Sequence, residues 1–168
     1  MITIRAETAE DVSSVRRVNE AAFERKEEAD LVDRLREAAE PRISLVAVSG
    51  AQVVGHIFFS PVTLEAEGAD FAIMGLAPMA VLPGHRNQGI GSRLVLEGLE
   101  QCRLIGCYVV VVLGHPEYYP RFGFVPASRK GLSCEYPVPD EAFMVTELKP
   151  NALSVGGLVK YRPEFGDV

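Results

Sequence analysis

The sequence predicts a single α/β domain over residues 1–168, and three observations support this prediction. Apolar residues recur at helical spacing over roughly the first forty residues and then give way to long apolar runs that are typical of strands. A glycine-containing turn, PGHRNQGIGS, separates the last of these long strands from another helical pattern. A chain of 168 residues with 48% apolar residues can bury one substantial core and has little room for a second.

A short strand and two helices are predicted at the N-terminal end. The strand covers residues 2–5. Thr8 and Asp11 have the spacing of a capping box, and apolar residues then recur at helical spacing as far as Phe23. A second helix is predicted over residues 27–40, because its apolar residues can share one buried face, and Pro41 ends it.

Three strands follow, over residues 43–49, 52–65 and 71–83. A tight turn at Gly50 joins the first two, and a polar loop that ends at Asp70 precedes the third, so an antiparallel meander is expected. Pro78 lies inside the third strand. Because proline cannot donate a hydrogen bond to a sheet ladder, a bulge or splay is predicted near Ala77 and Pro78.

A further helix is predicted from the glycine-containing turn to about Ile105. Its buried face is expected to consist of Ile90, Leu94, Val95, Leu99 and Cys102. The continuous apolar run at residues 108–113 is typical of a strand that is covered on both faces. A short helical turn, a strand from Phe124, a strand over residues 142–148 and an edge strand within residues 156–168 complete the expected order.

Composition argues against several classes of protein. A net charge of −6 does not suit a general nucleic-acid surface, and no apolar run reaches the roughly 18 residues of a membrane span. The N-terminus lacks the basic and apolar regions of a signal peptide. Cys102, Cys107 and Cys134 form no CxxC pair, which fits neither a disulfide framework nor a metal cluster. A cytoplasmic protein with reduced thiols and no metal, nucleic-acid or membrane partner is therefore expected.

The glycine-containing turn has the spacing R-x-x-G-x-G, formed by Arg86, Gly89 and Gly91. A P-loop would require Gly-Lys-Ser/Thr, which occurs nowhere in the chain, and a dinucleotide-binding fingerprint would require glycine where Leu94 stands. Glycines before a helix let an anion approach the unpaired backbone N–H groups of its first turn. The turn therefore predicts an anion site, unless its glycines serve only to join strand to helix.

The stretch VLPGHRNQGIGSRLV resembles motif A of the GNAT superfamily of N-acetyltransferases, and the preceding LAPMAVLP resembles the splayed fourth strand of that family. YVVVVLGHPEYYPRFGF resembles its second motif, and the matching positions are Tyr119, Arg121, Phe122, Gly123 and Phe124. The resemblance extends from Ile2 to about Leu148. It implies a mixed, mostly antiparallel sheet of about six to seven strands, splayed between the fourth and fifth and flanked by about four helices.

This resemblance implies that acetyl-CoA is the donor and a primary amine the acceptor, with direct attack in a ternary complex. The pyrophosphate would lie on the backbone N–H groups of residues 87–92, and the pantetheine arm would pair with residues 79–81. Arg86 either adds positive charge or braces the loop. The implied cofactor-binding residues are Met79, Ala80, Val81, Arg86, Asn87, Gln88, Gly89, Ile90, Gly91 and Ser92.

Tyr119 occupies the position of the family's general acid, which protonates the departing thiolate. Pro120 follows it and disfavours helical geometry at Tyr119, so Tyr118 is the alternative acid. A backbone N–H near Ala80 or Val81 would polarise the thioester carbonyl. Four candidates for the general base remain open, namely His56, Glu65, Glu67 and His115.

The acceptor is not readable from the sequence, and both a small-molecule amine and a peptide amine remain open. The loop between the first two helices, the loop over residues 65–70 and residues 133–143 are expected to shape its site. The C-terminal strand can be imagined to pair across two chains, which would give a homodimer. Two other functions compete, namely a non-catalytic acyl-CoA sensor or interaction module on the same fold, and a nucleotide-binding protein, which the missing motif residues disfavour.

Overall fold

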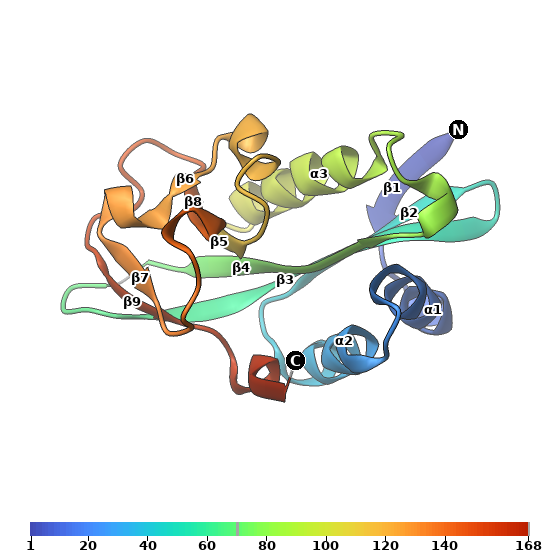
Figure 1. Cartoon of the computed structure of the whole chain (residues 1–168), viewed down its shortest axis with the longest axis horizontal. Coiled ribbons are helices and arrows are strands. Elements are labelled where there is room, and N and C mark those ends of the chain that lie inside the picture. Colours follow the sequence, from blue (N-terminus) through green and yellow to red (C-terminus); the bar gives the residue numbers. More distant parts are fainter. Residues whose placement is uncertain (70, 168) are drawn as a thin grey trace.

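The computed structural model, which describes residues 1–69 and 71–167, contains a mixed nine-stranded sheet (Figure 1). Its strands are β1 (Ile2–Ala6), β2 (Ile43–Ser49), β3 (Gln52–Glu65), β4 (Ile73–Val81), β5 (Val109–Leu113), β6 (Val125–Pro126), β7 (Leu132–Cys134), β8 (Phe143–Glu147) and β9 (Gly157–Lys160). The main order is β1-β2-β3-β4-β5-β8-β6. β9 pairs with the far end of β3, and β7 pairs with β9. The pairs β4–β5 and β7–β9 are parallel, and the other pairs are antiparallel.

The α-helices of the described residues are α1 (Val12–Phe23), α2 (Glu27–Ala38) and α3 (Ile90–Leu104). α3 covers one face of the sheet, whereas α1 and α2 lie together against the opposite face (Figure 1). The predicted buried face of α3 is confirmed, because all five of its residues are buried. On the opposite face Val15, Val18, Leu31 and Leu35 are buried against the sheet residue Phe58. Two apolar layers therefore enclose the sheet, as an α/β fold requires.

The predicted capping interaction before α1 is present. The Thr8 backbone N–H donates to Asp11 Oδ2 at 2.7 Å, and the Thr8 hydroxyl donates to the same atom at 3.0 Å. Arg5 donates to both carboxylate oxygens of Asp11, at 2.7 and 3.0 Å. The Arg5 guanidinium holds the pKa of the Asp11 carboxyl far below its usual range. This cluster fixes the junction between β1 and the helical layer.

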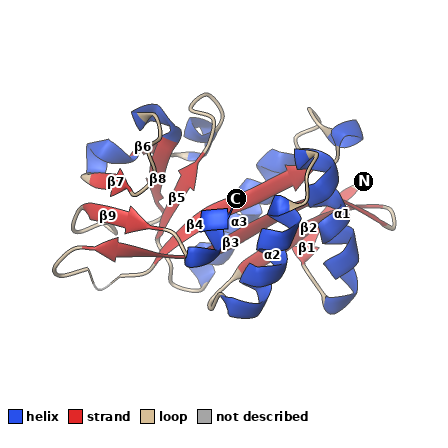
Figure 2. Cartoon of the chain, turned by 60° about the horizontal axis from the view of Figure 1, so that its bottom comes forward, coloured by secondary structure: helices blue, strands red, loops and turns tan. Residues whose placement is uncertain are grey.

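The predicted irregularity in β4 is also present. Ile57 pairs with Met79 and Phe59 pairs with Leu76, so Ala77 and Pro78 together lie opposite Phe58. This two-against-one arrangement is a bulge, and it falls where proline removes a backbone donor. β4 pairs with β5 only through residues 73–76, and beyond the bulge the two strands separate. The sheet is therefore split between its fourth and fifth strands, as Figure 2 shows.

The fold class is confirmed, while the counts and one placement differ from expectation. β6 and β7 have only two and three residues, too short for a periodic pattern, which is why nine strands appear rather than six or seven. The described residues contain three α-helices rather than about four, and the short helical turn predicted after residues 108–113 is a 3₁₀ turn, Tyr119–Phe122. The C-terminal strand β9 is not an edge strand, because β3 and β7 occupy both of its sides. It has no free side for pairing with a second chain.

After β9 the chain crosses back to α2 and forms a 3₁₀ turn, Pro163–Asp167, next to that helix (Figure 1). Arg34 of α2 donates to the Glu164 carbonyl at 3.1 Å, and Arg162 donates to the Ala38 carbonyl at 3.3 Å. We call residues 161–167 the C-terminal segment. These bonds attach it to the helical layer below the split in the sheet.

Candidate active site

The open edge of β4 is the first component of the site. The Leu82 N–H donates to the Val54 carbonyl at 2.9 Å, so the main chain of Leu82 faces β3. Along a strand, the backbone N–H and C=O groups of successive residues point to alternate sides. Those of Ala80 therefore point toward β3, and those of Met79 and Val81 point toward the open edge. A strand-like ligand arm can therefore form hydrogen bonds there.

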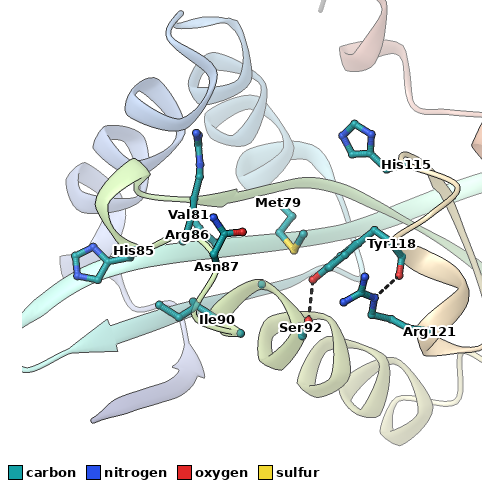
Figure 3. Close-up of a pocket in the computed structure, with 12 residues that line it drawn as sticks. Met79, Val81, His85, Arg86, Asn87, Ile90, Ser92, His115, Tyr118 and Arg121 are labelled. Atoms are coloured by element: carbon teal, nitrogen blue, oxygen red, sulfur yellow. Dashed lines mark hydrogen bonds between the residues drawn. The ribbon is translucent and has the colours of Figure 1, made fainter.

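A cleft of ≈ 760 Å³ lies between this edge and the start of α3 (Figure 3), and we call it the donor cleft. It is lined by Met79, Val81, His85, Arg86, Asn87, Gly89, Ile90, Gly91, Ser92, His115, Tyr118 and Arg121. The residues predicted to bind the cofactor all line this cleft except Ala80 and Gln88. The Ala80 side chain is buried in the core beneath α1 and α2, and Gln88 is exposed.

The start of α3 has the unpaired backbone N–H groups that can hold an anion. The first intrahelical bond runs from the Arg93 N–H to the Gly89 carbonyl at 3.1 Å, so the N–H groups of residues 90–92 have no partner within the helix. Gly89 has φ +79°, a left-handed conformation that glycine adopts without strain. A Cβ at Gly91 would stand 3.2 Å from the Tyr118 hydroxyl. The helix dipole and these free donors favour a phosphate at this place.

Arg86 braces the loop rather than reaching across the cleft. Its guanidinium donates to the Ala22 carbonyl at 3.0 Å, at the C-terminal end of α1. Positive side chains are favourable at this end of a helix. The sequence left two roles for Arg86, namely adding positive charge to the anion site or bracing the loop, and the contact to Ala22 corresponds to bracing.

The adjacent tyrosines lie in different surroundings. The Tyr118 hydroxyl lies 3.0 Å from the Ser92 hydroxyl inside the donor cleft, and Arg121 stacks 4.6 Å above the Tyr118 ring (Figure 3). Tyr119 is buried, and a side chain at Gly114 would collide with its ring. Burial, with a smaller contribution from Tyr118, raises the pKa of the Tyr119 phenol well above its usual range. Tyr119 therefore retains its proton at neutral pH.

A second cavity of ≈ 360 Å³ opens in the split of the sheet, and we call it the apolar pocket. Its lining residues come from five segments of the chain and are Phe23, Glu28, Leu31, Leu76, Ala77, Pro78, Met79, Leu113, Gly114, His115, Tyr119 and Phe165. Met79 and His115 line both cavities. The two cavities therefore adjoin each other at these two residues.

The four candidates for the base are placed very differently. His56 is fully buried, with Ser44 Oγ 2.8 Å from Nε2 and Asn19 Nδ2 3.2 Å from Nδ1. Burial lowers the pKa of His56 to about 3, and nearby Arg36 contributes in the same direction. Neither His56, Glu65 nor Glu67 lines either cavity, whereas His115 lines both.

Three pocket residues were missed by the sequence reasoning. Glu28 and Phe23 lie around the loop between α1 and α2, which was expected to shape the acceptor site, but no pattern singles them out. Phe165 lies about forty residues beyond YYPRFGF, where no motif exists. The loop over residues 66–69 and residues 133–143, both expected to contribute, supply no lining residue, and Asp70 lies outside the described residues.

Within residues 1–69 and 71–167, no three side chains of the metal-binding types come together. Over the same residues, no helix combines the length and the apolar character needed to cross a bilayer.

Comparison with known proteins gives consistent matches. Residues 3–127 match the family model of the acetyltransferase (GNAT) domain. The uncharacterized N-acetyltransferase YhbS of Escherichia coli K12 is 40% identical over 164 residues, 96% of this chain and 97% of that protein. The uncharacterized N-acetyltransferase YjhQ of the same organism is 40% identical over 156 residues, 89% of this chain and 86% of that protein.

Two solved structures resemble the chain in the same way. The crystal structure of Escherichia coli YhbS in complex with CoA has a TM-score of 0.91 and 38% identity, covering 98% of this chain and 92% of that one. A GNAT-family acetyltransferase from Brucella melitensis in complex with acetyl-CoA has a TM-score of 0.81 and 37% identity, covering 98% of both chains.

Proposed function

The chain belongs to the GNAT family of N-acetyltransferases, and from this premise we propose that it transfers the acetyl group of acetyl-CoA directly to a primary amine in a ternary complex. Family membership establishes an acetyl-CoA-dependent N-acetyltransferase. The observation that carries the finer proposal is the pair of cavities that meet at Met79 and His115. This arrangement allows donor and acceptor to be bound at the same time.

The donor cleft suits the three parts of coenzyme A. The free N–H groups of residues 90–92 would hold the pyrophosphate, and the main chain of Met79 and Val81 would pair with the amides of the pantetheine arm. The thioester would then lie near the bulge, where the two cavities meet. A backbone N–H on this open edge would polarise its carbonyl oxygen, and strand alternation favours Val81 over Ala80 as that donor.

In the proposed reaction the neutral amine attacks the thioester carbonyl carbon, and the C–S bond breaks as the amide forms. Tyr119 donates its phenolic proton to the departing thiolate of coenzyme A. Its position supports this role, because Tyr119 lines the apolar pocket together with Met79 and His115, where the two cavities meet. Burial raises the pKa of its phenol, which keeps Tyr119 protonated before the reaction but makes it a weaker acid than a free tyrosine. Tyr118 is the alternative acid, with its hydroxyl in the donor cleft next to Ser92.

His115 is the proposed base, which takes the proton that the amine loses. Imidazole is the side chain best suited to exchange a proton near neutral pH. In Figure 3 the His115 ring points away from the Ser92 and Tyr118 hydroxyls. This orientation, together with its place in the lining of the apolar pocket, supports a position on the acceptor side.

Steady-state kinetics of Tyr119→Phe and Tyr118→Phe, combined with CoA titration by calorimetry, test the proposal. For Tyr119→Phe we expect kcat to fall by about 100-fold, the lower range for loss of a general acid, with an unchanged Kd for CoA. Tyr118→Phe should mainly weaken CoA binding, since it removes the contact to Ser92. If Tyr118→Phe alone abolished turnover, Tyr118 would be the acid instead.

The competing function is a non-catalytic acyl-CoA sensor on the same fold. It predicts that acetyl-CoA binds while no thiol is released with any amine of a broad panel. Under that hypothesis neither the parent protein nor Tyr119→Phe shows turnover. Thiol release from acetyl-CoA, dependent on added amine, excludes the sensor.

A further inference from the structure

The lining of the apolar pocket carries almost no charge. Its walls are formed by Phe23 of α1, Leu31 of α2, Leu76 and Pro78 of β4, and Leu113 of β5. Neither lysine nor arginine occurs among the described residues that line it, and Glu28 is their only carboxylate.

The single carboxylate is already neutralised. Arg25 Nε donates to Glu28 Oε1 at 2.9 Å, and Arg25 Nη2 donates to Glu28 Oε2 at 2.5 Å. The Glu28 side chain is only 9% exposed, so this pairing takes place with little water around the carboxylate. A two-point contact of this kind uses both carboxylate oxygens. The pocket therefore offers no free negative charge to a second cationic group of a ligand.

Phe165 closes the pocket from the C-terminal segment. Its ring packs edge-on against Tyr161, with 5.3 Å between centroids, and the adjacent Glu164 is bonded through its carbonyl to Arg34. Arg162 bonds to the end of α2 in the same way. The aromatic wall is thus held in place by neighbours on two sides.

We propose that the acceptor is a small monoamine whose body is apolar, such as an arylalkylamine or a branched alkylamine. The inference rests on the proposed transferase function and specifies its acceptor. The amine nitrogen lies at the end shared with the donor cleft, beside Met79 and His115, and the apolar body extends toward Phe23 and Phe165. A second ammonium or a carboxylate on the acceptor would lose its water without gaining a partner.

A panel of acceptors tests this inference, with thiol release from acetyl-CoA as the readout. The probes are 2-phenylethylamine and 3-methylbutylamine as apolar monoamines, spermidine and kanamycin as polycations, glycine as a zwitterion, and a peptide with a free N-terminus. We expect kcat/KM for the apolar monoamines to exceed that for each charged probe by about 100-fold, on the scale by which a pocket rejects unpaired polar groups. Equal or better turnover of spermidine, kanamycin, glycine or the peptide overturns the inference.

Phe165→Ala locates the preference in the pocket. We expect KM for 2-phenylethylamine to rise about tenfold, with kcat and the Kd for CoA unchanged, because the apolar wall is lost while the donor cleft is not. Phe71→Ala is the matched control, since Phe71 is a half-buried phenylalanine that lines neither cavity. An unchanged KM in Phe165→Ala, or an equal rise in Phe71→Ala, contradicts the assignment.

Calorimetric titration of 2-phenylethylamine into the CoA-bound protein separates this inference from the proposed function. In one outcome 2-phenylethylamine binds, Phe165→Ala weakens this binding, and no probe is turned over. That outcome would contradict the transferase mechanism and support the preference of the pocket for apolar monoamines. Turnover of a charged probe without binding of 2-phenylethylamine would leave the mechanism standing and remove the preference.

Discussion

The donor cleft and the apolar pocket share one strand but are built in opposite ways. The cleft is drawn mainly from residues 79–92 and depends on main-chain groups, glycines and a helix start. The pocket is drawn from five segments, the first and last of which are more than 130 residues apart in the chain, and depends on large side chains. A site made from continuous backbone leaves a readable motif, whereas a site made from scattered side chains leaves none.

The largest effect is expected for the strand pair β3–β4, which supports both the donor cleft and the apolar pocket. His56 of β3 is buried opposite Ala80, and its pKa is lowered to about 3. Below the ordinary histidine pKa of about 6.5 the unfolded chain binds a proton that the folded chain cannot. Stability should therefore be complete above that pH and fall as pH drops toward 3, by on the order of 4 kcal/mol for this group.

Urea unfolding at pH 7, 6, 5 and 4 measures this effect. In His56→Gln the loss of stability between pH 7 and pH 4 should be clearly smaller than in the parent chain. His115→Gln is the control, because His115 is exposed, and it should keep the parental pH dependence. Identical pH slopes in His56→Gln and the parent would show that His56 does not govern acid stability.

A second prediction concerns a variant that impairs only the donor cleft. In Gly91→Val the new side chain would stand between the Tyr118 hydroxyl and Met79, in the path of the cofactor. We expect the Kd for CoA to rise about 100-fold, as for the loss of one or two hydrogen bonds to a charged group. Gly84→Val should bind normally, since nothing lies within 4 Å of its Cβ position. Calorimetry compares the two, and equal affinities would contradict a backbone cradle at Gly91.

The smallest effect is expected for a variant that alters only the apolar pocket. Arg162→Ala removes the bond to the Ala38 carbonyl and the contact to Glu164 at 2.9 Å. We expect KM for an apolar monoamine to rise about threefold, the size of one net hydrogen bond, with CoA affinity unchanged. Arg103→Ala removes an exposed ion pair with Glu100 on α3 and should leave KM as it was. A change in CoA affinity in Arg162→Ala would mean that the two regions are not separable.

The same contrast explains how far sequence reasoning reached. The long elements were predictable because each repeats a hydrophobic period, as the confirmed buried face of α3 illustrates. The bulge at Pro78 followed from one missing N–H. By contrast, β6 and β7 are held by pairing with distant strands and have no period of their own.

Side-chain direction limited the prediction of the site. Met79 and Ala80 are neighbours in the motif, yet successive strand residues point to opposite faces, so only Met79 lines the cleft. His56 and His115 were both candidates for the base from the sequence, and their burial distinguishes them, because His56 is fully buried whereas His115 is exposed. Phe165 enters the pocket because the chain returns to α2 after β9, a path that no local pattern encodes.

The bond from Arg86 to the Ala22 carbonyl joins the two regions directly, because Ala22 precedes Phe23, a wall of the apolar pocket. If this bond couples the two sites, each ligand must change the affinity for the other by the same factor. If coenzyme A draws the Arg86 loop inward and shifts Phe23, amine binding must alter the affinity for coenzyme A by the same factor. The factor has the same value whether it is measured through the affinity for the amine or through the affinity for coenzyme A.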